Sequence, residues 1–149
     1  MSLEQQFDWQ NKIDIKSLEL GELEEHLAAM GQPKFRSKQI YSWLHEKRVD
    51  SFDQMSNLPA ALREQLEQRY YINRLSIIKK LVSKLDGTQK YLLRLKDNNC
   101  VEAVLMKYKY GNSICISTQV GCRMGCKFCA STLAGLVRSL DSSEMLDEI

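Results

Sequence analysis

The local sequence pattern changes once along this chain of 149 residues, and that change limits the fold more than any other feature. Up to residue 71 the sequence has the pattern of short helices. From residue 75 onward, segments rich in β-branched and aromatic residues are separated by the turn sequences DGT, DNN and YGN. The chain is therefore expected to be α+β, with helices first and antiparallel strands after them.

Three short helices are predicted in the first part, over residues 21–31, 36–47 and 57–71. Pro59 lies near the first turn of the third helix, where a missing N–H costs little. We expect residues 1–73 to form a small helical domain.

Four strands are predicted in the next part, over residues 75–85, 89–96, 100–108 and 113–119. In the last of them, strict alternation puts two isoleucines on one face and polar residues, Cys115 among them, on the other. One face of this strand is therefore expected to be apolar, and the other is expected to carry polar groups that can bind or react.

The last part of the sequence, residues 112–149, is expected to begin a further domain, with residues 74–111 as a β-strand connection. A helix is predicted over residues 129–140, and a new helix start at Asp141, with Glu144 three residues on as in a capping box. One strand followed by one crossover helix is a fraction of a parallel α/β sheet. We therefore expect the chain to be an N-terminal piece of a longer protein.

The composition is that of a soluble globular protein, with 44% hydrophobic and 27% charged residues and a net charge of +2. No apolar run approaches the roughly 20 residues needed to cross a bilayer, and the first residues lack the features of a secretion signal. A cytoplasmic location is expected. In that reducing compartment, a cluster of cysteines is more typical of metal binding or catalysis than of structural disulfides.

A basic and aromatic segment, residues 34–48, interleaves five Lys and Arg residues with Tyr41 and Trp43. Cations and aromatic rings together suit RNA. The alternative is a solvated basic helix face, with Ile40, Trp43 and Leu44 packing inward.

Three of the five cysteines, Cys122, Cys126 and Cys129, lie within eight residues. A structural zinc site takes four ligands, and the only two histidines lie in the helical part. An electron-transfer [4Fe–4S] cluster also takes four thiolates, so three thiolates leave one iron open. The spacing Cys-x3-Cys-x2-Cys, with Phe128 before the third cysteine, resembles the signature of the radical S-adenosylmethionine enzymes.

The resemblance is narrower than that superfamily. Residues 32–66, 100–108 and 113–140 together resemble the RlmN family of adenine-C2 methyltransferases, which modify 23S ribosomal RNA and transfer RNA. A related adenine-C8 rRNA methyltransferase that confers antibiotic resistance shares the cysteine loop and is the nearest alternative. A non-catalytic zinc or RNA-binding module is the alternative from a different class.

The family resemblance implies a [4Fe–4S] cluster on Cys122, Cys126 and Cys129. It implies S-adenosyl-L-methionine on the open iron, with its adenine against Phe128, at the start of a partial (β/α) barrel. Methylation would proceed through a methyl-cysteine near the C-terminus of the longer protein. Because that cysteine and further cofactor motifs are not in these 149 residues, we expect this piece alone to be inactive.

The resemblance also assigns two catalytic residues. Cys115 resembles the cysteine that abstracts the ring proton and forms a disulfide, and the polar strand face suits a reactive thiolate. The alternative is a small buried hydrophobe. Glu102, the only acid in an apolar strand, resembles a glutamate that assists proton transfer. The alternative is that this strand is an edge strand and Glu102 lies in water. Cys100 shares a face with Glu102 and is expected to serve only in packing.

The partners implied by the resemblance are 23S rRNA, tRNA and an electron donor such as flavodoxin or ferredoxin. We expect a monomer and no membrane. Ala134 stands where many relatives carry a second glycine beside Gly135, and a left-handed backbone at Ala134 would be strained.

Overall fold

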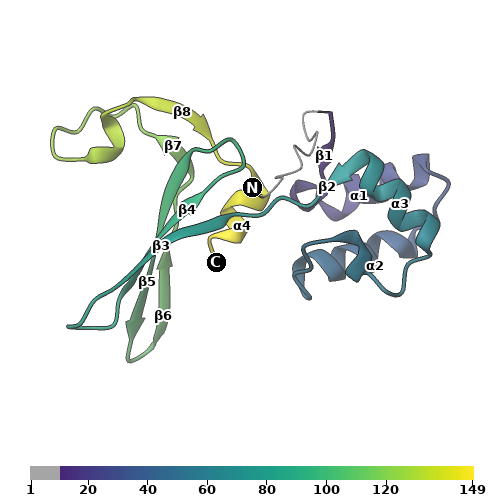
Figure 1. The fold of residues 1–149 in the computed structure, drawn as a ribbon, viewed down its shortest axis with the longest axis horizontal. Helices are drawn as coiled ribbons and strands as arrows, with labels where there is room; N and C mark the ends of the chain where they lie inside the picture. Colours follow the sequence, from purple (N-terminus) through teal and green to yellow (C-terminus); the bar gives the residue numbers. More distant parts are fainter. Residues whose placement is uncertain (1–10) are drawn as a thin grey trace, which may run out of the picture. The chain divides into compact units, whose positions relative to one another are not determined.

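The structure is a computed structural model that describes residues 11–149. The chain divides into two compact units, with the boundary between Asn73 and Arg74. Residues 11–73 form the helical unit and residues 74–149 form the sheet unit (Figure 1). The predicted order, with helices first and strands after them, is confirmed.

Three α-helices make up most of the helical unit, as the sequence predicts. The helices are α1 (Leu20–Ala29), α2 (Phe35–His45) and α3 (Ala60–Arg69), and the shorter elements are β1 (Ile13–Asp14), η1 (Ile15–Ser17), η2 (Phe52–Gln54) and β2 (Tyr70–Tyr71). Pro59 is the N-cap of α3, where its missing N–H breaks no helical hydrogen bond. Strands β1 and β2 pair in parallel and join the two ends of the unit.

The core of the helical unit is built from apolar residues spaced four apart on each helix, so that each helix turns one face inward. The buried residues are Ile15, Leu23, Leu27, Ile40, Leu44, Phe52, Met55, Leu58, Leu62, Leu66 and Tyr70. Trp43 packs against this core as a partly buried side chain. The predicted inward packing of Ile40, Trp43 and Leu44 is therefore confirmed.

A four-stranded antiparallel sheet is the centre of the sheet unit. Its strands are β3 (Ser76–Val82), β4 (Gln89–Arg94), β5 (Cys100–Tyr108) and β6 (Gly111–Cys115), in the order β3-β4-β5-β6. All four predicted strands are present. Asn98 adopts a φ of 65° in the turn before β5, a conformation that Asn tolerates better than most residues.

One face of the sheet covers a small core. Val101 and Ala103 of β5 are buried with Leu93 and Leu95, and Val120 and Leu140 complete the cluster. Because side chains alternate along a strand, the residues between them on β5 lie on the opposite face, which is more exposed. The sheet unit therefore has one packed face and one open face.

The predicted helix over residues 129–140 is wrong. This segment contains the 3₁₀ turn η3 (Ala130–Thr132) and the strand β8 (Leu136–Ser139), which pairs antiparallel with β7 (Gln119–Gly121). Gly135 adopts a φ of 69°, which ends any helical path before β8. The expected βα unit of a partial barrel stays a prediction, because its parallel partner strand was expected in the longer protein, and the segment after the cysteine loop forms the antiparallel β7–β8 pair.

The final helix, α4 (Ser142–Asp147), begins where the sequence predicts. Asp141 is its N-cap, and the Asp141 N–H donates to the Glu144 carboxylate at 2.9 Å in a capping box. Glu144 is buried at the start of the helix, where a negative charge also suits the helix dipole.

Arg138 of β8 joins three segments of the sheet unit. Its guanidinium donates to Asp97 at 2.7 Å and to both carboxylate oxygens of Glu144 at 2.7 and 2.8 Å. Hydrogen bonds to Glu144 and then to Asp97 raise the pKa of Arg138. Burial acts to raise the pKa of Asp97, but hydrogen bonds from Arg138 and Asn99 outweigh it and hold that pKa below its usual value. These contacts fix β8 to α4 and to the turn after β4.

Glu148 is a second buried carboxylate, just after α4. One of its oxygens accepts the Ser117 N–H at 2.9 Å, and the other is buried without a hydrogen-bond partner. Burial raises the pKa of Glu148, Glu144 nearby adds to the rise, and the Ser117 hydrogen bond opposes it. Glu148 thus anchors the segment after β6 while carrying a charge that the fold disfavours.

Arg138→Met is expected to destabilise the chain by about 2 to 4 kcal/mol, because Glu144 would stay buried without its cation. Urea denaturation followed by circular dichroism measures the change. Arg123→Met, at an exposed arginine, is the control and should change stability by no more than about 0.5 kcal/mol. Equal losses in the two variants would contradict the role of Arg138.

Glu148→Gln keeps an acceptor for the Ser117 N–H and removes the buried charge. A folded-state pKa above the unfolded value means that the native state binds more protons at pH values between the two. The wild type therefore loses stability as pH rises through that window, which begins near the ordinary glutamate pKa of 4.5. The variant should therefore be more stable than the wild type at pH 7, with a smaller advantage near pH 4. A difference that does not depend on pH would refute this account.

Candidate functional site

The register of β5 and β6 brings the two sequence-predicted catalytic residues to the same face of the sheet. Cys115 lies opposite Val104 on the neighbouring strand. Glu102 is two residues before Val104 and so shares its face, which makes Glu102 and Cys115 diagonal neighbours across the strand pair. Such neighbours lie about 7 to 8 Å apart, within reach of one small substrate.

Glu102 has a cationic neighbour that the sequence analysis did not identify. Its carboxylate pairs with the Lys90 ammonium of β4 at 2.8 Å, and both side chains are about half exposed. Strand β5 lies between β4 and β6, so the alternative of an edge strand is wrong although Glu102 does reach water. The turn between β4 and β5 sets the register of the two strands, and this register is the feature of the sequence that could have indicated that Lys90 lies near Glu102.

The thiols on this face are exposed. Cys115 is free and exposed, so the alternative of a small buried hydrophobe is wrong. Cys100 is also free and exposed, and its predicted packing is wrong because it lies on the open face together with Glu102. An exposed thiol is accessible to a reaction partner, which is one requirement of a reactive cysteine.

The loop that carries the other three cysteines is closed at its base by backbone contacts alone. The Cys122 N–H donates to the Gly135 carbonyl at 3.0 Å. Within the loop, the Thr132 hydroxyl donates to the carbonyls of Cys126 and Cys129 at 3.1 and 2.8 Å. The segment between the second and third cysteines is therefore held by these two bonds and by the Cys129 N–H, which donates to the Cys126 carbonyl at 3.1 Å.

Gly121 permits the close approach at the base of the loop. Its φ is 74°, and a Cβ built on it would lie 1.9 Å from the Gly135 carbonyl oxygen. The left-handed position at the other side of the base is Gly135 itself, with a φ of 69°, while Ala134 has no positive φ. The replacement of a glycine by Ala134 is thus accommodated without backbone strain.

The three loop cysteines, Cys122, Cys126 and Cys129, are free and partly exposed. In residues 11–149, no three Cys, His, Asp or Glu side chains are gathered closely enough to hold a single metal ion. In an iron–sulfur cluster each thiolate binds a different iron, so the sulfurs do not need to meet at one point. Phe128, at 93% exposure, extends into solvent beside the third cysteine and has no place in the core.

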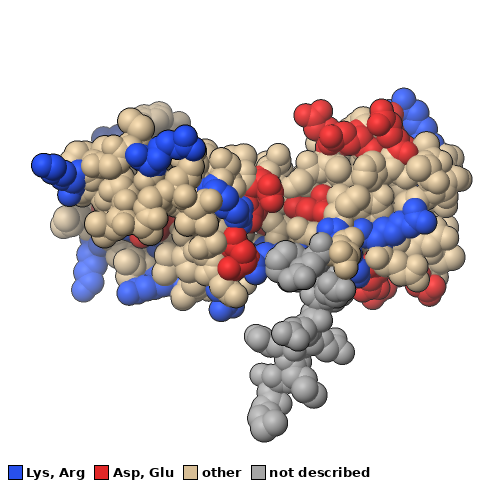
Figure 2. All heavy atoms as spheres, turned by 90° about the horizontal axis from the view of Figure 1, so that it is seen from above, with Lys and Arg blue, Asp and Glu red and all other residues tan. Residues whose placement is uncertain are grey.

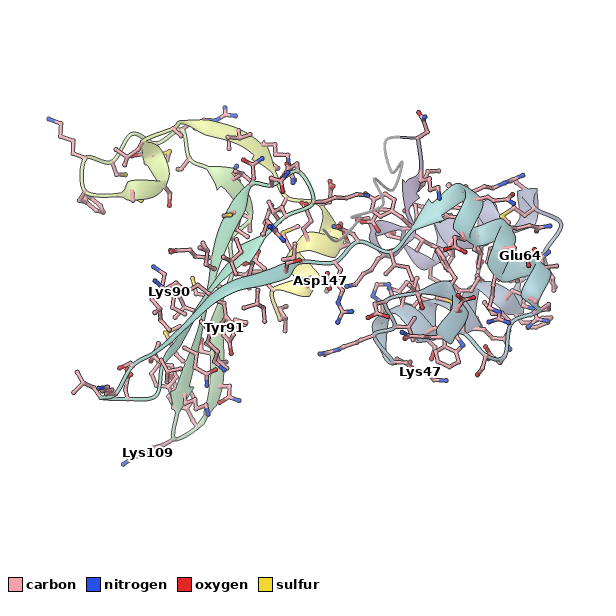
Figure 3. All side chains as sticks on the ribbon, in the orientation of Figure 1. Lys47, Glu64, Lys90, Tyr91, Lys109 and Asp147 are labelled. Atoms are coloured by element: carbon pink, nitrogen blue, oxygen red, sulfur yellow. The ribbon has the colours of Figure 1, made fainter. Side chains whose placement is uncertain are left out.

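The basic segment of the helical unit divides between paired and open cations. Lys34 pairs with Glu24 at 2.8 Å, and Arg36 donates to the Asn57 carbonyl at 3.2 Å. The Lys47 ammonium lies 3.5 Å from the centre of the Trp43 ring (Figure 3 labels Lys47).

Lys38 and Arg48 are exposed as well. The segment 34–48 therefore combines a helix that packs its apolar face inward with exposed cations, one of which lies over the Trp43 ring.

Comparisons with known proteins identify relatives of this chain. Residues 13–72 match the family described as ribosomal RNA large subunit methyltransferase N-terminal domain. A protein of Lachnoclostridium phytofermentans, named probable dual-specificity RNA methyltransferase RlmN, is 57% identical over 138 residues, which cover 93% of this chain and 39% of that protein. A protein of the same name from Staphylococcus aureus (strain JH9) is 48% identical over 139 residues, covering 93% and 38%.

A solved structure supports the same relation. The crystal structure of a radical SAM methyltransferase from Sphaerobacter thermophilus matches with a TM-score of 0.80 and 39% sequence identity, covering 91% of this chain and 40% of that one. The chain is thus a homologue of radical S-adenosylmethionine RNA methyltransferases. It belongs to the RlmN family, and it spans about two-fifths of the length of the curated relatives it matches. No helix in residues 11–149 is long and apolar enough to cross a membrane.

Gly121→Ala is expected to disrupt the base of the cysteine loop, because the new Cβ would collide with the Gly135 carbonyl. Gly125→Ala is the matched control, since Gly125 also has a positive φ, of 68°, but open space around its Cβ position. We expect the control to lose about 1 kcal/mol from backbone strain and Gly121→Ala to lose clearly more. Urea denaturation and the alkylation rate of the loop thiols measure the effect, and equal changes in both variants would contradict it.

Proposed function

We propose that this chain is part of an enzyme that methylates C2 of adenine in 23S rRNA and tRNA by radical S-adenosylmethionine chemistry. The observation that carries the proposal is the loop of three free cysteines that follows a sheet face bearing Glu102 and Cys115. The relatives named as dual-specificity RNA methyltransferases support the two RNA substrates.

The donor set of the loop suits an iron–sulfur cluster with one open iron. Cys122, Cys126 and Cys129 are proposed to hold the cluster, since three soft thiolates leave one coordination position for a cofactor. With S-adenosyl-L-methionine, such a cluster supplies one-electron radical chemistry. The exposed ring of Phe128 is proposed to lie against the adenine of that cofactor.

Radical addition suits this substrate because C2 of adenine is not nucleophilic and does not accept a methyl cation readily. After addition, the proton on C2 must leave. Cys115 is proposed to take it as a thiolate. The bond between the sulfur of the methyl-carrying cysteine and the carbon now on C2 then breaks as that cysteine and Cys115 join in a disulfide, and a proton completes the methyl group. One electron is left over, and a cluster held by the loop cysteines would accept it. Glu102 is proposed to relay the proton from C2, and its partner Lys90 holds the carboxylate on the open face.

The helical unit is proposed to contact the RNA through residues 34–48. Its exposed Lys38, Lys47 and Arg48 can approach phosphates, and Trp43 beneath Lys47 adds an aromatic surface. A small electron carrier, such as flavodoxin or ferredoxin, is the proposed source of electrons for the cluster. The working unit is proposed to be a cytoplasmic monomer.

Anaerobic reconstitution of the 149-residue chain with iron and sulfide tests the proposal. The wild type is expected to turn brown and to retain iron and sulfide after gel filtration. Cys126→Ser should lose both, because two thiolates hold a cluster poorly. Cys100→Ser is the matched control, an exposed cysteine outside the loop, and should retain the wild-type iron content.

A colourless chain that binds one zinc would contradict the proposal and favour a structural metal module. In the longer protein, mapping of the new methyl group distinguishes C2 from C8 of adenine.

A further inference from the structure

Two tyrosines form an exposed stacked pair at the tip of the β5–β6 hairpin. Tyr108 ends β5, Lys109 and Tyr110 make the turn, and Gly111 starts β6 with a φ of 140°. The two rings have centroids 5.0 Å apart and planes within 5° of parallel. Tyr108 is 47% exposed and Tyr110 is 84% exposed. The pair therefore presents aromatic surface to solvent without any contact to the core.

The surroundings of this pair are positively charged. Lys107 and Lys109 alternate with the tyrosines and are exposed, and Figure 3 shows Lys109 extending away from the tip of the hairpin. Residues 76–115 contain eight Lys and Arg but three Asp and Glu, a net charge of +5 in a chain whose total is +2. Figure 2, which views the sheet unit from the end opposite this hairpin tip, shows that Lys and Arg side chains are frequent there as well.

The tyrosine pair belongs to the open face of the sheet. Tyr108 has the same strand parity as Glu102 and Val104, so its side chain starts from the face that carries the candidate catalytic residues. It is four residues beyond Val104, which lies opposite Cys115, a separation of about 13 Å along the strand. A chain of nucleotides could contact both places.

We propose that Tyr108 and Tyr110 form a stacking site for an unpaired base of the RNA, with Lys109, in the turn between them, contacting an adjacent phosphate. Aromatic side chains beside a cationic track are the usual means of holding single-stranded RNA. The assignment of that base as a neighbour of the methylated adenine rests on the proposed function, whereas the stacking itself does not.

The alternation of charges and rings favours RNA over a protein partner. The core of a protein interface is depleted of lysine, and here a lysine stands beside each tyrosine. Paired bases inside a duplex have no free ring face to offer, so a stacking site selects single strands.

Fluorescence anisotropy with a labelled single-stranded RNA 12-mer of mixed sequence tests the proposal on the 149-residue chain. Tyr110→Ala should weaken binding about tenfold, whereas Tyr110→Trp should bind at least as well as the wild type because it keeps an aromatic face. Leu85→Ala is the matched control: Leu85 is 99% exposed in the neighbouring hairpin turn but has no π-system, so its removal should leave the affinity unchanged. Circular dichroism checks that each variant is folded.

A probe of the same length without bases separates stacking from charge. Wild type and Tyr110→Ala should bind this abasic probe equally. Equal binding of the 12-mer by the two proteins, equal losses on both probes, or a shift from dimer to monomer on Tyr110→Ala in sedimentation would each overturn the proposal. If reconstitution gives no cluster while the tyrosine dependence persists, the stacking site stands and the proposed methyltransferase function fails.

Discussion

The pairing of β5 with both of its neighbours is the interaction on which the sheet unit depends. It puts Val101 and Ala103 into the core and leaves Glu102 and Tyr108 on the open face. A slip of one residue would exchange the two sets and bury a carboxylate in place of two apolar side chains. The core and the candidate site are thus consequences of the same hydrogen-bonded register, and neither can change alone.

The segments that follow the sheet are held by polar contacts as much as by apolar packing. Arg138 connects β8 with Glu144 and Asp97, and Glu148 receives the backbone N–H of Ser117. These contacts are directional, so they fix where the segments lie more closely than a small apolar core can. Their cost is the burial of carboxylates, which is offset for Glu144 by an arginine and only partly for Glu148 by a single hydrogen bond.

The helices and the four main strands could be predicted because their signals are local: apolar spacing, turn residues and capping residues. The helix predicted over residues 129–140 failed because Gly135 adopts a left-handed conformation and β7 offers a pairing partner, and neither fact is visible in the local composition. Cys100 was expected to pack, but strand parity puts it on the open face. The partnership of Lys90 with Glu102 depends on the register between two strands, which a list of residues does not contain.

The way the base of the cysteine loop is closed affects how freely the amino-acid sequence of the loop can vary. Gly121 and Gly135 close it through main-chain atoms, and the bond from Cys122 to Gly135 uses no side chain. The side chains between the two glycines therefore take no part in this closing bond, and the ligand that they hold can determine which residues stand there. A designer could exchange the sulfur donors for other metal ligands and keep the scaffold, provided that the two glycines remain.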